Sequence, residues 1–172
     1  MDISKISIGK NAPEDINVII EVPMDSNPIK YEFDKDSGAV FVDRFLSTPM
    51  HYPCNYGFVP HTLCGDGDPL DVLVITRYAL VPSCVINVRP VGVLLMEDES
   101  GVDEKIIAVP NYKIHKYYNA VENLSHIPES LLNEIKHFFE RYKDLDQGKW
   151  VNVMGFEDVE KAKEIIKKSI IK

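Results

Sequence analysis

Residues 66–76 read DGDPLDVLVIT, so three carboxylates stand within six residues and lead directly into an apolar run. Three like charges this close together repel one another unless a cation neutralises them. Gly67 and Pro69 stiffen the loop, and a short, rigid loop of oxygen ligands suits Mg²⁺ or Mn²⁺. The stretch therefore predicts a divalent-metal loop at the start of a buried strand, with a solvated polar turn as the alternative. An EF-hand is excluded, because Asp71 stands where its loop needs glycine and Arg77 where it needs glutamate.

The chain on either side of this loop has the pattern of short strands. Runs of apolar and β-branched residues are separated by Pro, Asn, Asp and Gly, which favour turns. The expected strands are 17–22, 29–33, 40–45, 70–76, 84–96 and 106–109. Many short strands with frequent turns predict a small barrel or a sandwich and not alternating βαβ units.

The last third of the chain changes to a helical period. From Ile127 the apolar residues are spaced by about three and four, which predicts an amphipathic helix with Ser125 as a possible cap. A second helix is expected from about 157 to 171. No linker, repeat or low-complexity stretch interrupts the sequence, so we expect a single domain, 1–172, that is mainly β with α (α+β). The stripe of the first helix is Leu131, Leu132, Ile135, Phe138, Phe139 and Tyr142.

Composition excludes several classes of protein. The formal net charge is -8, from 19 Lys and Arg against 27 Asp and Glu, so we expect no cationic face for nucleic acid. The hydrophobic fraction of 45% is too high for a disordered chain. The longest apolar stretch, 91–96, is far shorter than the roughly 20 residues of a membrane-spanning helix. We therefore expect no nucleic-acid partner and no membrane association.

Cysteine usage indicates a reducing compartment. Cys54, Cys64 and Cys84 are odd in number and show no CxxC spacing, which favours reduced thiols over disulfides or a zinc site. Residues 1–10 lack the basic start and apolar stretch of a signal peptide, so the expected location is the cytoplasm. Cys64 lies close to Asp66, and a buried inert thiol is the favoured interpretation.

A second acidic cluster, EDESGVDE at 97–104, lies between two expected strands. By itself this cluster predicts an exposed hairpin tip. It bears on function only if the tip folds back onto the 66–71 loop, where its carboxylates would extend the metal site.

Cations and phenols complete a possible phosphate site. Alternation on strand 29–33 places Lys30 and Glu32 on one face, which suits either a solvated surface or a charged cleft. Tyrosines at 52, 56 and 142 suit either phosphate-binding hydroxyls or ordinary core and surface positions. Acids for divalent metals, with separate cations for an anion, indicate metal-assisted phosphoryl transfer or hydrolysis. The separate cations are Lys30, Arg44, Lys105 and Lys143.

The segment DGDPLDV at 66–72 resembles the signature of the soluble family I inorganic pyrophosphatases. The resemblance extends from about 17 to 150, and the length is similar to that of the short bacterial members. The other segments that carry it are IEVP at 20–23, IKYEFD at 29–34, FVDRF at 41–45, YPCNYGFVPHTL at 52–63, RPVGVL at 89–94 and HFFERYKDLDQGKW at 137–150.

This resemblance implies Mg²⁺-dependent hydrolysis of inorganic diphosphate to two orthophosphates, with Mn²⁺ or another divalent ion as a possible substitute. It also implies a small closed OB-like β-barrel with two helices from the C-terminal region packed outside, and a homohexamer. The family's general base matches Asp68. The metal-binding aspartates match Asp66, Asp71, Asp98 and Asp103. The substrate-binding residues match Lys30, Arg44, Tyr56, Lys105, Tyr142 and Lys143, with Glu21, Glu32 and Tyr52 at supporting positions.

Three other functions, one catalytic and two non-catalytic, fit parts of the sequence. Another metal-dependent phosphohydrolase, for nucleotides or phosphomonoesters, is the main alternative, although GxxxxGK[ST] and GxGxxG motifs are absent. An oligonucleotide-binding barrel needs a basic groove with stacking aromatics, which the acidic balance disfavours. A structural Ca²⁺-binding module predicts ion binding without turnover.

Overall fold

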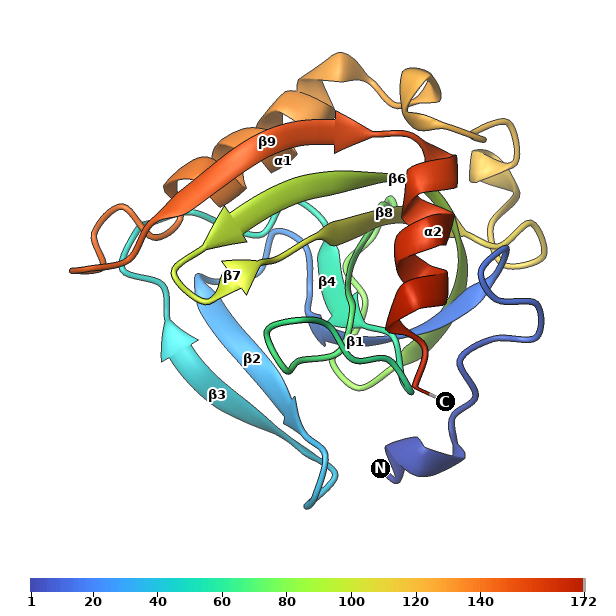
Figure 1. The fold of residues 1–172 in the computed structure, drawn as a ribbon, viewed down its shortest axis with the longest axis horizontal. Coiled ribbons are helices and arrows are strands. Elements are labelled where there is room, and N and C mark those ends of the chain that lie inside the picture. Colours follow the sequence, from blue (N-terminus) through green and yellow to red (C-terminus); the bar gives the residue numbers. More distant parts are fainter. Residues whose placement is uncertain (172) are drawn as a thin grey trace.

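A closed ring of paired strands forms the centre of the molecule. The structure, a computed structural model, describes residues 1–171; residue 172, the last of the expected domain, lies outside the described residues. Around the ring, β1 pairs with β4, β4 with β5, β5 with β8, β8 with β6, and β6 again with β1. This closure agrees with the barrel that the resemblance implied (Figure 1). The ring strands are β1 (Ile16–Val22), β4 (Asn55–Phe58), β5 (Asp71–Val74), β6 (Val85–Asp98) and β8 (Lys105–Pro110).

Further strands extend the ring or lie beside it. β2 (Ile29–Asp34) and β3 (Ala39–Phe45) form a separate antiparallel hairpin, at the lower left of Figure 1. The long strand β6 continues past the ring to pair with β7 (Gly101–Val102) and β9 (Val151–Glu157). The sequence patterns predict the hairpin and most of the ring, but not β4, β7 or β9. Each of these three strands contains a glycine, which weakens the strand pattern.

The register of the ring decides which residues meet at its end. β5 and β8 run parallel, with Asp71 opposite Lys105, and antiparallel β4 places Phe58 opposite Asp71. Gly57 lets β4 approach β1 closely, since a Cβ at this position would lie 2.0 Å from the carbonyl oxygen of Ile19. The loop before β5 and the turn before β8 are therefore brought to the same end of the ring.

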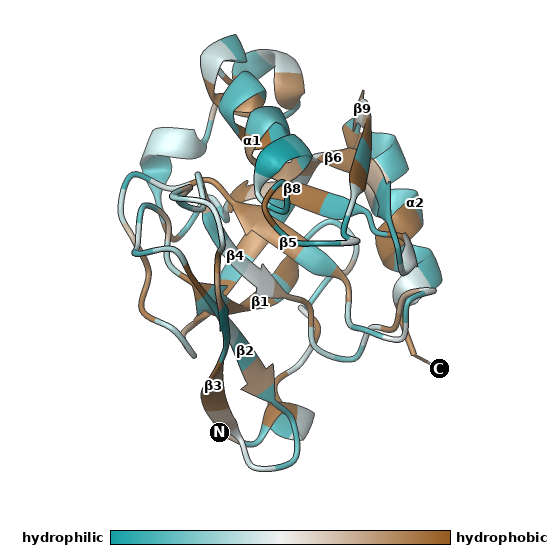
Figure 2. Ribbon diagram, turned by 90° about the vertical axis from the view of Figure 1, so that its left-hand side faces the viewer, coloured by the Kyte–Doolittle hydropathy of each residue, from teal (hydrophilic) through white to brown (hydrophobic). Residues whose placement is uncertain are grey.

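Two helices cover the strands from outside, as expected. α1 (Glu129–Arg141) contributes Phe138 and Phe139 to one buried cluster, and α2 (Val159–Ser169) contributes Ile166 to a second. Figure 2 shows hydrophobic residues concentrated in the central strands, while α1 is largely hydrophilic on the side facing the viewer. The apolar stripe of α1 thus faces the ring, which is the arrangement that its sequence period predicted.

The start of α1 differs from the expectation. Pro128 occupies the N-cap position and makes no side-chain capping bond. Ser125 is not the cap, because it lies inside a separate 3-10 helix, Leu124–His126, whose own cap is Asn123. α2 begins with a capped N-terminus, since the side chain of Asp158 accepts a hydrogen bond from the backbone N–H of Lys161.

Within residues 1–171 no helix has both the length and the apolar character needed to cross a membrane. The three cysteines are free thiols, as expected. Burial raises the pKa of Cys64 to about 12, so this thiol is a weak nucleophile although it lies beside the acidic loop.

Candidate active site

A cavity of about 250 Å³ lies where β5 and β8 begin. Every residue that the family resemblance assigned to the site lines this cavity, although these residues come from positions 21 to 143 of the chain. They are Glu21, Lys30, Glu32, Arg44, Tyr52, Tyr56, Asp66, Asp68, Asp71, Asp98, Asp103, Lys105, Tyr142 and Lys143.

The two acidic segments meet in this cavity. The 97–104 segment forms the β6–β7 turn, which by itself would be a hairpin tip. Asp103 of this segment and Asp71 of the first loop both contact Lys105. The second acidic cluster therefore folds back onto the first, which is the condition for its functional interpretation.

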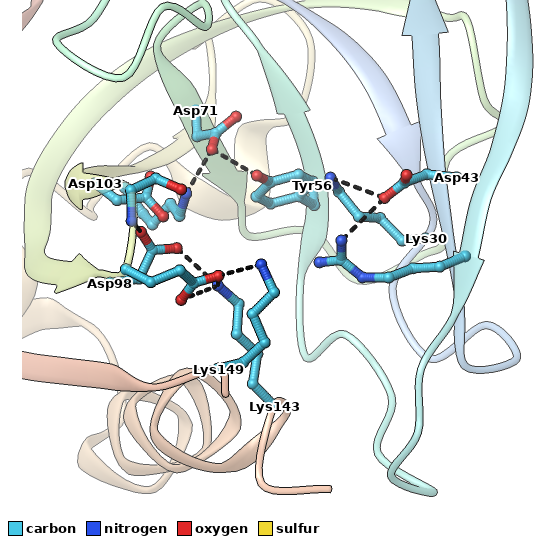
Figure 3. A network of polar contacts seen from close by, with 12 residues as sticks. Lys30, Asp43, Tyr56, Asp71, Asp98, Asp103, Lys143 and Lys149 are labelled. Carbon is cyan, nitrogen blue, oxygen red and sulfur yellow. Dashed lines mark hydrogen bonds and ion pairs between the residues drawn. The ribbon is translucent and has the colours of Figure 1, made fainter. Parts of the chain in front are cut away.

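Lys105 is the most deeply buried cation of the site, with 3% of the residue exposed. Its Nζ lies 2.5 Å from Asp71 Oδ2 and also contacts Asp103 Oδ1 (Figure 3). Tyr56 donates its hydroxyl hydrogen to the same Asp71 oxygen, at 2.5 Å. Burial favours the neutral amine, but the two carboxylates outweigh it and raise the pKa of Lys105 above its ordinary value. Lys105 is therefore charged at every physiological pH.

A second group of ion pairs joins the β6–β7 turn to the segment after α1. Lys143 Nζ lies 2.7 Å from Asp98 Oδ2 and 3.4 Å from Glu99 Oε1. Lys149 Nζ lies 2.5 Å from the same Glu99 oxygen. Burial opposes the charge on Glu99, but the lysines overcome it and lower the pKa of this carboxyl to about 2. Figure 3 shows Lys143 and Lys149 pointing up from the segment after α1 toward the acidic turn.

A third group lies on the β2–β3 hairpin. Asp43 Oδ2 is 3.2 Å from Lys30 Nζ and 3.2 Å from Arg44 Nη1. Glu32 Oε2 is farther from Lys30 Nζ, at 3.9 Å. The two cations of the hairpin thus share one carboxylate (Figure 3).

The acidic loop itself is held through its backbone. Gly67 has a φ of 93°, a conformation that favours glycine, and the loop turns there. Asp68 donates its backbone N–H to Asp66 Oδ1 at 3.0 Å, and its carbonyl accepts from the backbone N–H of Cys64 at 2.7 Å. Among residues 1–171, no hydrogen bond or ion pair engages the Asp68 carboxylate. The side chain is therefore free while its backbone is fixed.

Aromatic packing fixes the tyrosines. The ring of Tyr52 lies 5.2 Å from that of Tyr56 and 4.6 Å from that of Phe138 in α1, centroid to centroid. Phe138 in turn stacks on Tyr142 at 5.1 Å. Burial raises the pKa of the Tyr142 hydroxyl, so it remains a neutral hydrogen-bond donor. The phenols are thus core residues and cavity residues at the same time.

The cavity wall also includes polar residues that neither the patterns nor the resemblance assigned. These are Lys35, Ser100 and Lys149, and Glu99 of the second acidic cluster lines the wall with them. Glu99 belongs to the acidic segment 97–104, and Lys149 to the segment 137–150 that resembles the family. Their types were visible in the sequence, but a turn residue can be assigned to a cavity only when the fold shows where the turn lies.

The donor set fits a hard divalent cation. Five aspartates line this one cavity, and carboxylate oxygens are the ligands that Mg²⁺ and Mn²⁺ prefer. Over the described part of the chain, no three acidic, histidine or cysteine side chains are gathered tightly enough to hold an ion. Lysine nitrogens instead lie against Asp71, Asp98 and Asp103. At Asp71 and Asp103 the lysine contacts a single carboxylate oxygen, so the second oxygen is available to an ion.

Glu21 is an acid buried beside the hairpin. Its side-chain Oε1 accepts a hydrogen bond from the backbone N–H of Phe33 at 2.8 Å, and 7% of the residue is exposed. Burial, the largest cause, raises the pKa of Glu21 to about 8 from an ordinary 4.5. The folded chain therefore holds this proton at pH values where the unfolded chain has lost it.

Glu21 should make the stability of the metal-free protein fall as pH rises. Because its pKa is higher in the folded chain, the free energy of unfolding decreases between the two pKa values. In chelator-treated protein, we expect the native chain to lose about 2 kcal/mol more than Glu21→Gln between about pH 5.5 and about pH 7.5. Denaturant unfolding of both proteins at the two pH values measures the difference. Equal losses would contradict the prediction.

Comparison with known proteins finds relatives that are similar to this chain over almost their whole length and are named as inorganic pyrophosphatases or, in one case, as an inorganic phosphatase. An inorganic pyrophosphatase of Agrobacterium fabrum is 61% identical over 170 residues, which cover 99% of this chain and 96% of the relative. The crystal structure of an inorganic phosphatase from Anaplasma phagocytophilum is 54% identical, with a TM-score of 0.95, and covers 96% of this chain and 97% of that one. The inorganic pyrophosphatase from Thermus thermophilus is 44% identical, with a TM-score of 0.93 and coverages of 99% and 97%.

A sequence model of the family described as inorganic pyrophosphatase matches residues 18–172. The match leaves out only the segment before β1 and the first residues of that strand. The fold, the contents of the cavity and the relatives agree, and the chain belongs to the inorganic pyrophosphatase family.

Proposed function

We propose that this chain hydrolyses inorganic diphosphate to two orthophosphates in a Mg²⁺-dependent reaction. The observation that carries the proposal is one cavity in which five aspartates lie beside lysines, an arginine and tyrosine hydroxyls. Such a cavity suits divalent cations at the carboxylates and a small polyanion at the cations. The relatives at 61% and 44% identity are named for the same activity.

The metal ligands in this proposal are Asp66, Asp71, Asp98 and Asp103. Divalent ions bound there would lower the pKa of a water molecule toward neutrality and offset the charge of diphosphate. Mg²⁺ is the proposed cofactor, with Mn²⁺ or another divalent ion as a substitute, because the ligands are hard carboxylate oxygens and not thiolates or imidazoles.

Asp68 is the proposed general base. Its backbone is anchored on both sides, while its carboxylate makes no ion pair within residues 1–171. A base must reach the attacking water and accept its proton, and a carboxylate already engaged by a lysine is less able to do so. Asp71, Asp98 and Asp103 are each engaged in this way. The Asp66 carboxylate accepts a hydrogen bond from the Asp68 backbone, so Asp68, which matches the family's general base, has the free carboxylate.

The substrate is held from two sides of the cavity. Lys30 and Arg44 reach it from the hairpin, and Lys105 and Lys143 from the barrel and the segment after α1. These cations would bind phosphate oxygens and spread the charge that develops as the bridging bond breaks. Tyr56 and Tyr142 would donate hydrogen bonds to phosphate oxygens without adding charge.

The supporting residues stabilise this arrangement. Glu21 fixes the hairpin through the backbone N–H of Phe33. Glu32 adds a carboxylate 3.9 Å from Lys30. Tyr52 packs between Tyr56 and α1, so it holds one substrate-binding phenol in place.

The size of the cavity favours diphosphate over nucleotides. A volume of about 250 Å³ that is walled by charged groups accommodates a small polyanion with its metal ions. A nucleoside triphosphate would also need an apolar platform for its base. The proposed enzyme works in the cytoplasm, with residues 1–172 as one catalytic domain, and three free cysteines support a reducing compartment.

Purified protein should release orthophosphate from diphosphate quickly with Mg²⁺ and not with excess chelator. We expect ATP and p-nitrophenyl phosphate to be hydrolysed far more slowly under the same conditions. A colorimetric phosphate assay on the three substrates measures this. If folded, Mg²⁺-loaded protein released no phosphate from diphosphate, the proposed function would be wrong.

Replacing Asp68 by Asn should lower kcat for diphosphate by about 10²–10⁴-fold, the usual range for loss of a general base. Fold and metal binding should persist, because the Asp68 backbone bonds and the other aspartates remain. Steady-state kinetics, circular dichroism and Mg²⁺ titration test the three parts. The control is Glu104→Gln, which removes a nearby acid that lies outside the cavity wall. Near-normal turnover by the Asn variant would remove Asp68 from this role.

The chain should assemble as a homohexamer in solution. This prediction rests on the family resemblance, and exposed side chains such as Phe45, Val81 and Tyr117, which are 70%, 70% and 64% exposed, are candidates for subunit contacts. Light scattering coupled to size exclusion should give about six times the mass of one chain. A monomer or dimer at micromolar concentration would show that the family's usual assembly does not extend to this protein.

A further inference from the structure

Asp43 does not line the cavity, and neither the sequence patterns nor the family resemblance gave it a role, yet it contacts two of the proposed substrate-binding cations. Its Oδ2 atom lies 3.2 Å from both Lys30 Nζ and Arg44 Nη1. The three side chains are 28%, 23% and 41% exposed, respectively, so the group lies at the cavity rim and is partly shielded from water. This carboxylate is therefore the immediate counter-ion of both cations.

A β-bulge creates this arrangement. In the β2–β3 pairing, Lys30 lies opposite Arg44 and Tyr31 lies opposite Val42, so Asp43 is an extra residue without a partner. In a regular strand, neighbouring side chains point to opposite faces, and Asp43 would point away from Arg44. A bulge breaks this alternation and redirects a side chain, and bulges of this kind are frequent beside active sites. The local backbone thus places Asp43 on the same side as the two cations.

We infer that Asp43 is a positioning residue that holds Lys30 and Arg44 together and weakens their binding of phosphate. This inference rests on the proposed function, since it assumes that the two cations hold a phosphoryl group. Two cations this close repel one another, and a shared carboxylate offsets that repulsion while the site is empty. When a phosphate anion takes the same two partners, the carboxylate beside it becomes a repelling neighbour.

The consequence concerns release of product as well as binding of substrate. A site built only to bind would omit the acid, because an unopposed pair of cations binds a polyanion more tightly. An enzyme with two anionic products must also let them leave, and excess affinity for product limits turnover. Asp43 lowers the affinity of one half of the site without removing a cation that stabilises developing charge.

Asp43→Asn tests the inference directly. Asn has nearly the same shape and keeps an oxygen that accepts from both cations, but it lacks the charge. We expect the Kd of inorganic orthophosphate, measured by titration calorimetry with and without Mg²⁺, to fall about tenfold, a typical size for one charge removed at such a distance. The KM for diphosphate should fall by a similar factor, while kcat should not rise. Asp43→Ser removes the same charge with a smaller side chain and should also tighten phosphate binding.

The matched control is Asp36→Asn. Asp36 is an exposed acid in the turn of the same hairpin, makes no ion pair within the described residues, and does not line the cavity. Its removal changes the net charge equally and should leave the phosphate Kd within about twofold of wild type. Lys30→Met should weaken phosphate binding, which confirms that the measured site is this one.

The outcomes separate the inference from the proposed function. Unchanged or weaker phosphate binding by both Asp43 variants, in a protein that still hydrolyses diphosphate, would overturn the inference and leave the function standing. A wild-type protein that neither binds orthophosphate nor hydrolyses diphosphate would overturn the function itself. Equal tightening in Asp36→Asn would show a general effect of net charge and would also overturn the role of Asp43.

Discussion

The ion pairs of Lys105 are the interaction on which the rest of the cavity depends. An ammonium group that is 3% exposed costs several kcal/mol to desolvate unless carboxylates lie beside it. Asp71 and Asp103 meet that need only because β5 and β8 run parallel in the register that places Asp71 opposite Lys105. That register brings the loop before β5 to the turn before β8. The two acidic segments are therefore neighbours for the same reason that Lys105 can be buried.

Charge compensation extends from this pair to the whole cavity. Lys143 lies against Asp98 and Glu99, and the hairpin cations lie against Asp43. A chain with a net charge of -8 thus keeps a dense group of acids together by matching them with its own cations. In the proposed function, metal ions and diphosphate would exchange partners with groups that are already charged and oriented. Exchange of this kind avoids the cost of burying new charge and is a form of electrostatic preorganisation.

The sequence predicted those helices and strands whose apolar residues follow a regular helical or strand spacing. The stripe of α1 is a local pattern that the structure confirms, and β2 and β3 lie where short apolar runs predicted strands. The alternation expected over 29–33 is interrupted by the β-bulge after Lys30. β4 has four residues with Gly57 among them, too short and too irregular for a pattern to show. The place of Asp43 depends on a bulge, which needs both strands to be defined. The site residues came from the resemblance, whereas Lys35 and Lys149 were identified only when the turns were seen folded around the cavity.

The helix α1 takes part in the electrostatics although it carries no charge into the cavity. Phe138 packs between Tyr52 and Tyr142, and Tyr52 packs on Tyr56. These four rings form an aromatic column, and its three tyrosines line the cavity. Tyr56 in turn donates to Asp71, and its ring lies 5.7 Å from Lys105 Nζ. Apolar packing excludes water from these ion pairs, and electrostatic interactions are stronger where water is excluded. Loosening this aromatic packing would hydrate the Lys105 ion pairs, so the packing of α1 sets the strength of interactions made by residues far earlier in the chain.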